Sequence, residues 1–407
     1  MTGSAEQLPL DMIRIAFTMI GGKSWIGGYN YLINLLKVIT AYHPTALQPV
    51  LFFGTDTDPD EILPFEAIGG IEIITSSALN ADKRVLSLIT SLIFGANPST
   101  RRLFREHRIE IVFENAQYHG AHLGIPAIAW IPDFQHRELP QLFSRSAWWK
   151  RELGFRAQIS GGRTIMLSSA DSRETCERYY PATVGRTHVV RFAVPSAHRP
   201  DAFTAREVCD IYGIPEHYFY LPNQFWQHKN HLLVIEALAL LKHANPDIIV
   251  VASGKQLDPN KPDHFERILS RVSETGVESQ FRLLGMIPYE HVAPLMVDSV
   301  AVLNPSLFEG WSTTVEEARA LKVPLILSDL AVHREQAGGI AHFFDRTCAK
   351  SLANALLSAW LERNHAGVAI DGKATSVTYP VQRFADDFVK LVQLVADGCR
   401  SDSKLRK

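Results

Sequence analysis

The sequence predicts an α/β protein of two domains, each with a parallel sheet covered by helices. At 407 residues the chain is too long for one hydrophobic core and suits two domains with their connections. Short apolar, β-branched runs alternate with helical patterns along the chain, as expected of βαβ units. This alternation breaks at residues 195–201, a proline-containing stretch, and then restarts. We therefore expect two Rossmann-like domains.

Composition and charge exclude several classes of protein. Hydrophobic residues make up 46% of the chain and charged residues 21%, as in an ordinary globular protein. The formal net charge of -2 provides no overall attraction to nucleic acid. The four cysteines are far apart and show no paired metal-ligand spacing, which fits a reducing compartment. No signal peptide and no run of about 20 apolar residues is apparent, so we expect a cytoplasmic protein whose membrane contact, if it has one, is peripheral.

A glycine-rich turn follows the first predicted strand. The strand covers residues 13–19, and an amphipathic helix is predicted over residues 29–39. The turn between them contains Gly27 and Gly28, where the backbone can approach a ligand closely. Its spacing matches neither the G-x-G-x-x-G fingerprint nor the Walker lysine pattern. The alternative is a helix start that only requires small residues.

The remainder of the first half continues the strand and helix alternation. Further strands are predicted at residues 49–53, 71–75, 109–113 and 164–169. Residues 101–108 form a locally basic helix, which is either a solvated face or a surface that docks on anionic lipid. Residues 144–156 interleave basic side chains with Trp148, Trp149 and Phe155. That pattern suits base stacking, a membrane interface or an ordinary packed helix.

Two ionisable side chains follow the apolar strand that begins at residue 127. The strand ends at Pro132 and Asp133, and His136 comes three residues after Asp133. In open α/β sheets, ligands bind outside the carboxyl ends of the strands. Asp133 and His136 are therefore candidate site residues, and a structural histidine is the alternative interpretation of His136.

The second half repeats the alternation. Strands are predicted at residues 218–221, 248–252, 281–284, 300–303 and 323–328, and a last helix with apolar positions Phe384, Phe388, Leu391 and Leu394. A loop at residues 222–231 separates the first of these strands from a helix over residues 232–243. Lys229 lies in this loop, where its charge can neutralise a diphosphate. The alternative is a solvated surface lysine.

The segment after the strand at residues 300–303 has the geometry of an anion site. Ser312 and Thr313 can cap the next helix, and Glu316 can complete a capping box after Thr313. The exposed N–H groups and the dipole of a helix N-terminus favour a phosphate. Gly310 leaves room for the ligand because it has no side chain. The sequence therefore predicts a phosphate-binding loop here.

Two glutamates flank that loop. Glu309 precedes the helix and Glu317 lies about one turn inside it, so both can accept hydrogen bonds from sugar hydroxyls. With its preceding Asn-Pro-Ser, this segment resembles the E-x7-E motif of the retaining glycosyltransferases of family 4, which have the two-domain GT-B fold. The resemblance covers essentially the whole chain. An isolated pair with this spacing is more often two solvated side chains beside a helix start.

The resemblance implies a division of the chain. Residues 1–195 would form an N-terminal Rossmann-like domain on the acceptor side, and residues 196–376 a C-terminal Rossmann-like domain that binds the nucleotide sugar. The two domains would face a cleft. Residues 377–407 would form a crossover helix that returns to the N-terminal domain, and a tail.

The resemblance also implies roles for individual residues. Glu309 would contact the transferred sugar, Glu317 the nucleotide ribose and Lys229 the diphosphate. Many members of the family carry an arginine at the position of Asn223, so Gln224, His228 or another cation would share that task here. A histidine or His-Asp pair near the transferred sugar corresponds to His136 and Asp133. The other implied donor contacts involve Gly27, Gly28, Lys255, Met286, Gly310, Trp311, Ser312 and Thr313.

The implied activity is the transfer of a hexose from a nucleoside diphosphate sugar to an acceptor hydroxyl with retention of configuration. The nucleotide sugar is a co-substrate, and no other cofactor is implied. No Asp-x-Asp-type carboxylate pair is placed to carry a divalent ion, so we expect metal independence. The acceptor would be a saccharide or a lipid-linked saccharide in polysaccharide or glycolipid assembly. A nucleotide-sugar epimerase of GT-B fold and a catalytically silent nucleotide-sugar-binding scaffold stay open as alternatives.

Overall fold

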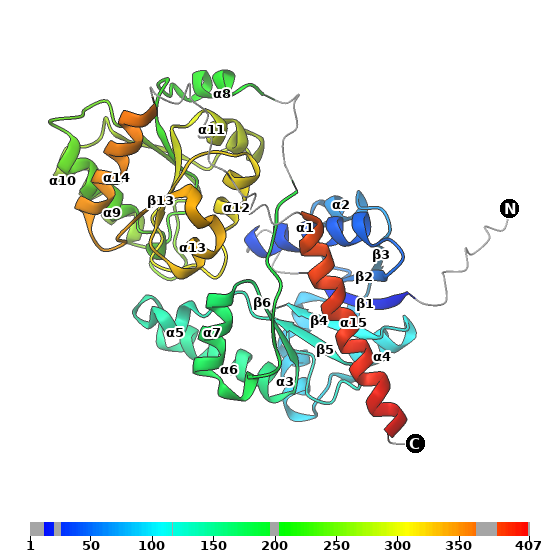
Figure 1. Cartoon of the computed structure of the whole chain (residues 1–407). Helices are drawn as coiled ribbons and strands as arrows, with labels where there is room; N and C mark the ends of the chain where they lie inside the picture. The colour runs from blue at the N-terminus through cyan, green and yellow to red at the C-terminus, as the bar shows by residue number, and fades with distance from the viewer. Residues whose placement is uncertain (1–11, 20–25, 116, 196–202, 364–380, 406–407) are drawn as a thin grey trace. The chain divides into compact units, whose positions relative to one another are not determined.

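The chain folds into two compact α/β units (Figure 1). The computed structural model describes residues 12–19, 26–115, 117–195, 203–363 and 381–405. Residues 1–134, 149–193 and 379–407 belong to the first unit, and residues 135–148 and 194–378 belong to the second. Each unit contains one sheet, and the strand pairings in both sheets are parallel. The predicted fold class is confirmed.

The first unit is built on a seven-stranded sheet with the order β3-β2-β1-β4-β5-β6-β7. Its central strands are mostly apolar because helices cover both faces of a parallel sheet. The strands are β1 Ile13–Thr18, β2 Leu47–Phe53, β3 Glu72–Thr75, β4 Ile111–Asn115, β5 Ala127–Trp130, β6 Thr164–Leu167 and β7 Thr187–Val189. The edge strand β7 is half-buried and was not predicted, since it lacks the apolar run of the central strands.

Helices of the first unit connect these strands. They are α1 Ile26–Tyr42, α2 Pro59–Glu66, α3 Arg84–Ile93, α4 Pro98–Glu106, α6 Arg145–Ser160, α7 Ala170–Tyr179 and α15 Val381–Leu405, with short 3-10 turns at η2 Ser77–Leu79, η3 Ala81–Lys83 and η5 Pro181–Thr183. Part of α6 clusters with the second unit. Two helices begin at a proline that follows a capping side chain, Asp58 for α2 and Asn97 for α4.

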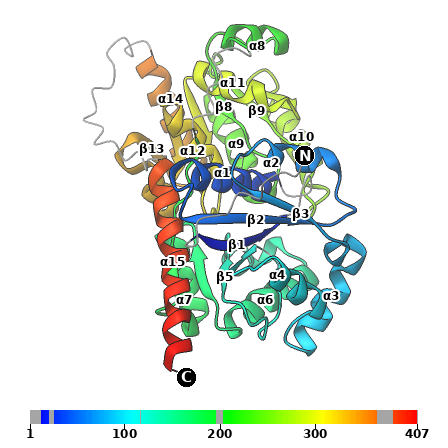
Figure 2. The same cartoon turned by 90° about the vertical axis from the view of Figure 1, so that its right-hand side faces the viewer.

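The last helix returns to the first unit, as predicted. Helix α15 packs against α1 and runs along one side of the sheet (Figures 1 and 2). Phe384 and Phe388 are fully buried, and the Phe388 ring lies 6.1 Å from that of Phe17 in β1. Leu394 was predicted on the same apolar face but is 54% exposed, because Val392 and Ala396 occupy the buried positions of that turn.

The second unit is built on a six-stranded sheet with the order β10-β9-β8-β11-β12-β13. Residues of β8 alternate between two apolar clusters, with Phe219 and Leu221 in one and Tyr220 in the other. Each face of the sheet therefore has its own core, as the two-residue period of a strand requires. The strands are β8 Phe219–Leu221, β9 Val250–Ser253, β10 Phe281–Gly285, β11 Ala301–Asn304, β12 Leu325–Ser328 and β13 Ala341–Phe344.

Helices cover both faces of this sheet as well. They are α8 Ala205–Tyr212, α9 His231–Leu241, α10 His264–Thr275, α11 Val292–Asp298, α12 Thr313–Ala320, α13 Ala331–Ala337 and α14 Ala349–Glu362. The short helix α5 Gln135–Glu138 also clusters with this unit. Short 3-10 turns occur at η4 Pro140–Leu142, η6 Gln227–Lys229, η7 Tyr289–His291 and η8 Gly338–Ile340. Helices α9, α10 and α14 supply one apolar cluster, and α8, α11 and α12 supply the other.

Each sheet has one point where the strand order reverses direction. In the first unit this point lies between β1 and β4, and in the second it lies between β8 and β11. Loops that leave adjacent strands there diverge to opposite faces, which opens a crevice at the carboxyl ends. The loop after β8 carries Lys229, and the loop after β11 carries Glu309. The strand order therefore brings together two residues that are 80 positions apart in the sequence.

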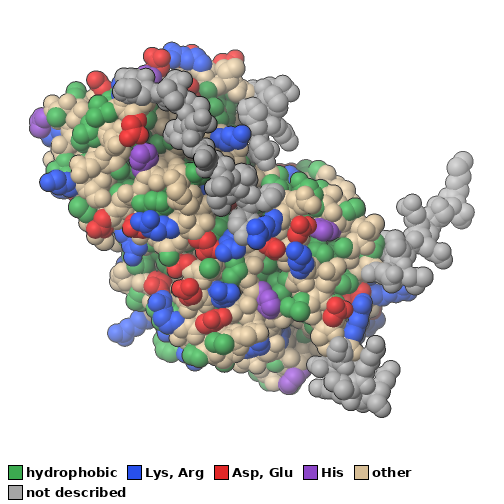
Figure 3. Space-filling model, viewed as in Figure 1, with side chains coloured by type: hydrophobic (Ala, Val, Ile, Leu, Met, Phe, Trp, Pro, Cys, Tyr) green, Lys and Arg blue, Asp and Glu red, His purple; other side chains and the backbone are tan. Residues whose placement is uncertain are grey.

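Surface charge is mixed in sign on the face that Figure 3 shows, where basic and acidic side chains are interspersed among apolar ones. This agrees with the near-neutral formal charge of -2. No helix in the described part of the chain is both long and apolar enough to cross a lipid bilayer.

Candidate functional site

The loop between β11 and α12 is fixed by a chain of hydrogen bonds. Ser312 is the N-cap residue of α12 and accepts a hydrogen bond from Val315 N at 3.4 Å. Asn304, the last residue of β11, donates to Ser312 Oγ at 2.8 Å. The N–H groups at the start of α12 therefore lie at the carboxyl edge of the sheet, where they favour an anion.

The predicted capping box of Thr313 and Glu316 does not form. Thr313 is the first helical residue rather than the cap, so Glu316 lies one position too far along the helix to complete a box with Ser312. Glu316 is buried and pairs with Arg319 at 2.7 Å. It also accepts a hydrogen bond from Gln336 Nε2 at 3.1 Å. The bond from Gln336 connects α12 to α13.

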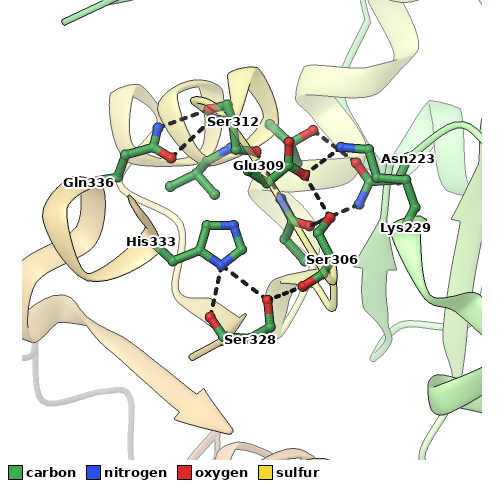
Figure 4. Close-up of polar contacts among 11 residues, drawn as sticks. Asn223, Lys229, Ser306, Glu309, Ser312, Ser328, His333 and Gln336 are labelled. Atoms are coloured by element: carbon green, nitrogen blue, oxygen red, sulfur yellow. Dashed lines mark hydrogen bonds and ion pairs between the residues drawn. The ribbon is translucent and has the colours of Figure 1, made fainter. Parts of the chain in front are cut away.

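An ion pair between Lys229 and Glu309 occupies the centre of the site (Figure 4). Lys229 Nζ lies 2.5 Å from Glu309 Oε1, and the two side chains are 14% and 10% exposed. Burial alone would raise the pKa of the Glu309 carboxyl, but the charge of Lys229, the neighbouring His228 and His333, and the hydrogen bond from Lys229 together lower it from 4.5 to about 2. Glu309 is therefore a carboxylate at neutral pH.

Ser306 shares one proton between two acceptors. Its Oγ lies 2.6 Å from Asn304 Oδ1 and 2.6 Å from Glu309 Oε1. A hydroxyl has a single proton and can donate to only one of them at a time. Asn223 extends this network, because its Nδ2 lies 3.4 Å from Asn304 Oδ1 and its Oδ1 accepts from Thr314 Oγ1 at 3.3 Å. The Asn223 amide thus connects the loop after β8 to the end of β11 and to the start of α12.

Helix α13 contributes two residues that the sequence did not predict. Gln336 is buried and makes a paired contact with the Ser312 backbone, accepting from its N at 3.1 Å and donating to its O at 3.0 Å (Figure 4). His333 Nδ1 lies 2.8 Å from Ser328 O, and burial lowers the pKa of the imidazole. Within the described residues, His333 Nε2 has no hydrogen-bond partner.

The loops after β8, β9 and β10 are packed against one another. Gly254 has φ +141°, and a Cβ on it would lie 2.5 Å from Asn223 O. Phe225 N donates to Lys255 O at 3.0 Å, and Gly254 N donates to Gly285 O at 2.8 Å. The side chains of Lys255 and Met286 are exposed. These loops therefore bring backbone groups together at the sheet edge, while the predicted Lys255 side chain points to solvent.

Glu317 has a different partner from Glu309. Its Oε1 accepts a hydrogen bond from the Tyr289 hydroxyl at 2.8 Å. Burial raises the pKa of the Glu317 carboxyl, and the bond from Tyr289 partly offsets this effect. Tyr289 begins the short turn η7 after β10 and is 57% exposed. The sequence did not predict Tyr289 as a site residue.

The remaining predicted residues of the loops near α12 differ in exposure. Gly310 is buried, and Trp311, Thr313 and Gln224 are half-buried. His228 is nearly buried, and its carbonyl accepts a hydrogen bond from Leu307 N at 2.7 Å. That bond connects the loop after β8 directly to the loop after β11.

Four predicted residues lie outside this cluster of loops. Gly27 and Gly28 belong to the first turn of α1, which begins three residues earlier than predicted. Asp133 pairs with Arg151 at 2.6 Å in the first unit. His136 is in α5, has no exposed surface, and its carbonyl accepts a hydrogen bond from Trp148 Nε1 at 2.7 Å.

The described residues around these loops do not form a metal-binding cluster. Among the residues that the structure describes, no three His, Cys, Asp or Glu side chains are grouped so as to hold a metal ion. The polar groups of the loops after β8 and β11 are amides, hydroxyls and one ion pair. Their chemistry suits a ligand that has both hydroxyls and negative charge.

Residues 213–367, which contain this whole cluster of loops, match the family described as Glycosyl transferases group 1. The chain carries a group 1 glycosyltransferase domain. Solved structures resemble the full chain in fold. Sucrose-phosphate synthase from Thermosynechococcus elongatus aligns with 14% identity and a TM-score of 0.65, covering 97% of this chain and 98% of its own.

Two further structures have the same fold. HepE from Anabaena, in complex with UDP and glucose, aligns with 16% identity and a TM-score of 0.64, covering 96% of this chain and 100% of its own. WaaG, a glycosyltransferase involved in lipopolysaccharide biosynthesis, aligns with 15% identity and a TM-score of 0.58, covering 95% and 99%. At these identities the likeness shows the fold alone, which is GT-B.

Proposed function

We propose that this protein transfers a sugar from a nucleoside diphosphate sugar to an acceptor hydroxyl, with retention of configuration and without a metal ion. The observation that carries the proposal is the ion pair of Lys229 and Glu309 beside the N-terminus of α12, at the switch point of the second sheet. One cation, one carboxylate and a row of N–H groups match a diphosphate joined to a sugar. HepE, solved with UDP and glucose, supports this class of donor.

Each group has a separate task in the proposed reaction. Lys229 and N–H groups at the N-terminus of α12, other than that of Ser312, which donates to Gln336, bind the diphosphate. They stabilise the charge that grows on it as the bond between the sugar and the phosphate oxygen breaks. Glu309 accepts hydrogen bonds from hydroxyls of the transferred sugar. Glu317 accepts them from the ribose. The acceptor hydroxyl attacks the anomeric carbon from the face that the phosphate leaves, and its proton passes to the leaving phosphate.

The acceptor class and setting are part of the proposal. We expect a saccharide or lipid-linked saccharide acceptor in polysaccharide or glycolipid assembly in the cytoplasm, and the role printed for WaaG in lipopolysaccharide biosynthesis is consistent with it. Asp133 and His136 stay candidates for contacts with the transferred sugar.

The test is a binding and turnover screen of nucleoside diphosphate sugars in the presence of EDTA. The wild type is compared with Glu309→Gln and with Glu278→Gln, which changes an exposed glutamate of the same unit. We expect one nucleotide series to raise Tm and to release nucleoside diphosphate slowly. Glu309→Gln should lower turnover by roughly a hundredfold or more, as the loss of a group aimed at the reacting centre does, while Glu278→Gln should not.

Product analysis distinguishes the alternatives. Retention predicts that the new glycosidic bond has the anomeric configuration of the donor. Conversion of the nucleotide sugar into an epimer without an acceptor would identify an epimerase, and binding without any consumption would identify a silent scaffold. A requirement for a divalent ion would contradict metal independence.

A further inference from the structure

Helix α3 of the first unit presents its apolar side to solvent. Seven large apolar side chains of this helix and its C-cap residue are between 45% and 72% exposed, namely Val85, Leu86, Leu88, Ile89, Leu92, Ile93 and Phe94. They are all of the large apolar residues between positions 84 and 94. In Figure 2 the helix lies at the periphery of the unit. A contiguous exposed apolar surface of this kind indicates a binding surface.

The polar side of α3 faces the protein. Ser91 is 1% exposed, and Ser87 and Thr90 are half-buried. Thr90 Oγ1 accepts a hydrogen bond from Asn97 Nδ2 at 3.1 Å, and Asn97 is the N-cap residue of α4. The helix is therefore amphipathic in the reverse sense of a surface helix that packs on a core. The Thr90 hydroxyl connects the helix to the start of α4, and its aliphatic side chains are available to a partner.

Charge around the helix identifies the partner. Residues 82–106 include five basic residues and two acidic ones, although the whole chain has a formal charge of -2. The basic residues are Lys83, Arg84, Arg101, Arg102 and Arg105, and the acidic ones are Asp82 and Glu106, of which Glu106 pairs with Arg102 at 2.7 Å. A second copy of this surface would place basic residues against basic residues across a two-fold axis, which is unfavourable. An anionic lipid surface matches both the charge and the apolar side chains.

We propose that α3 and Phe94 dock the protein on an anionic lipid membrane. The helix has 10 residues and is about 15 Å long at 1.5 Å per residue, which is too short to span a bilayer. It lies in the plane of the interface, with its leucines and isoleucines among the acyl chains and Lys83 and Arg84 at the headgroups. This surface is separate from the donor-binding loops, so the proposal does not depend on the sugar that is transferred.

The first test is vesicle flotation with the full chain. Vesicles contain phosphatidylcholine alone or phosphatidylcholine with phosphatidylglycerol. The variant Leu86→Asp/Ile93→Asp changes exposed residues of α3, and the control Leu240→Asp/Leu269→Asp changes exposed leucines of the second unit. We expect the wild type and the control to float with phosphatidylglycerol vesicles and the α3 variant to bind at least about tenfold more weakly. Equal flotation of the two variants would overturn the proposal.

Two further measurements test the roles of the helix and of its basic residues in membrane binding. Hydrogen exchange should slow in peptides covering residues 84–94 when phosphatidylglycerol vesicles are added, and unchanged exchange there would overturn the proposal. Lys83→Gln/Arg84→Gln should weaken binding to phosphatidylglycerol vesicles roughly tenfold or more. Equal binding to both vesicle types would overturn the choice of an anionic membrane. Self-association through α3 without vesicle binding, detected by sedimentation, would replace the membrane with a second copy.

Discussion

Replacing Lys229 with methionine tests whether the Lys229 and Glu309 ion pair holds the donor-binding loops together. Methionine keeps most of the length and apolar volume of the side chain but removes its charge. Glu309 would then remain a buried carboxylate without a cation at 2.5 Å. Removing one partner of a buried ion pair is costly because the other charge is left uncompensated.

The magnitude follows from the pKa of Glu309. That pKa falls from 4.5 to about 2 in the folded protein, because the lowering by Lys229, His228 and His333, with Lys229 the largest of the three, exceeds the raising by burial. This net difference of about 2.5 pKa units corresponds to roughly 3 kcal/mol. Because the folded pKa is depressed, the ionised carboxylate stabilises the fold above pH 4.5, and this stabilisation is lost as the pH falls from 4.5 toward 2. The two side chains are only 14% and 10% exposed, so solvent screens the interaction weakly.

Hydrogen exchange measures the free energy of local opening of these loops, so the measurement does not assume that the two units unfold together. Peptides that cover residues 223–230 and 304–312 should exchange roughly 100-fold faster in Lys229→Met than in the wild type at pH 7, since 1.4 kcal/mol corresponds to a factor of ten. The difference should shrink to about half in free energy near pH 3. Lys255→Met, which changes an exposed lysine of a neighbouring loop, is the control. Equal exchange in both variants, or a difference that grows in acid, would refute the reasoning.

Two substitutions test contacts next to the ion pair. Tyr289→Phe removes the hydroxyl that donates to Glu317 at 2.8 Å. Calorimetry should show that nucleoside diphosphate binds roughly fivefold more weakly, which corresponds to about 1 kcal/mol for one hydrogen bond. Unchanged or tighter binding would show that Tyr289 does not position Glu317. Gly254→Ala places a Cβ 2.5 Å from Asn223 O at φ +141°, so thermal denaturation should show a loss of about 1–3 kcal/mol in the free energy of unfolding. The control Gly339→Ala adds a Cβ where no atom lies within 4 Å and should change stability little. Equal effects of the two substitutions would contradict the strain at Gly254.

Local patterns predicted most of the scaffold, because each central strand is an apolar run that ends at a polar loop. The strand before Asn304 and the cap at Ser312 were predicted within a residue or two. Edge strands were harder to predict. Strand β13 has mostly half-buried or exposed residues, so its composition does not differ from that of a loop.

Residues that reach the site from another element could not be predicted from local pattern. Gln336 and His333 lie on α13, after a strand that is adjacent to β11 only in the folded sheet. Neither residue has a distinctive sequence context. The contacts of Glu316 also depend on which residue caps α12. Because Ser312 rather than Thr313 caps α12, Glu316 contacts Arg319 and Gln336 instead of the backbone.

In helix α3, hydrophobic periodicity indicates the wrong side as the buried one. Its pattern is amphipathic, and the usual inference is that the apolar side faces the core. The structure has the opposite orientation, because Thr90 is hydrogen-bonded to Asn97 and Ser91 is buried. Periodicity identifies two sides of a helix, but only the contacts of the folded chain determine which side packs inward.

The ion pair at the site also has a consequence for donor binding. A diphosphate at the N-terminus of α12 competes with Glu309 for Lys229, and when Lys229 turns away, burial raises the pKa of Glu309 from about 2. Sugar hydroxyls that donate to Glu309 compensate for this loss. We therefore expect a nucleoside diphosphate to bind with more proton uptake near pH 5 in the wild type than in Glu309→Gln, where only the terminal phosphate of the ligand still titrates, and the sugar derivative to show a smaller difference between the two proteins. Calorimetry in buffers of different ionisation enthalpy measures both differences, and equal differences would show that Glu309 does not contact the sugar.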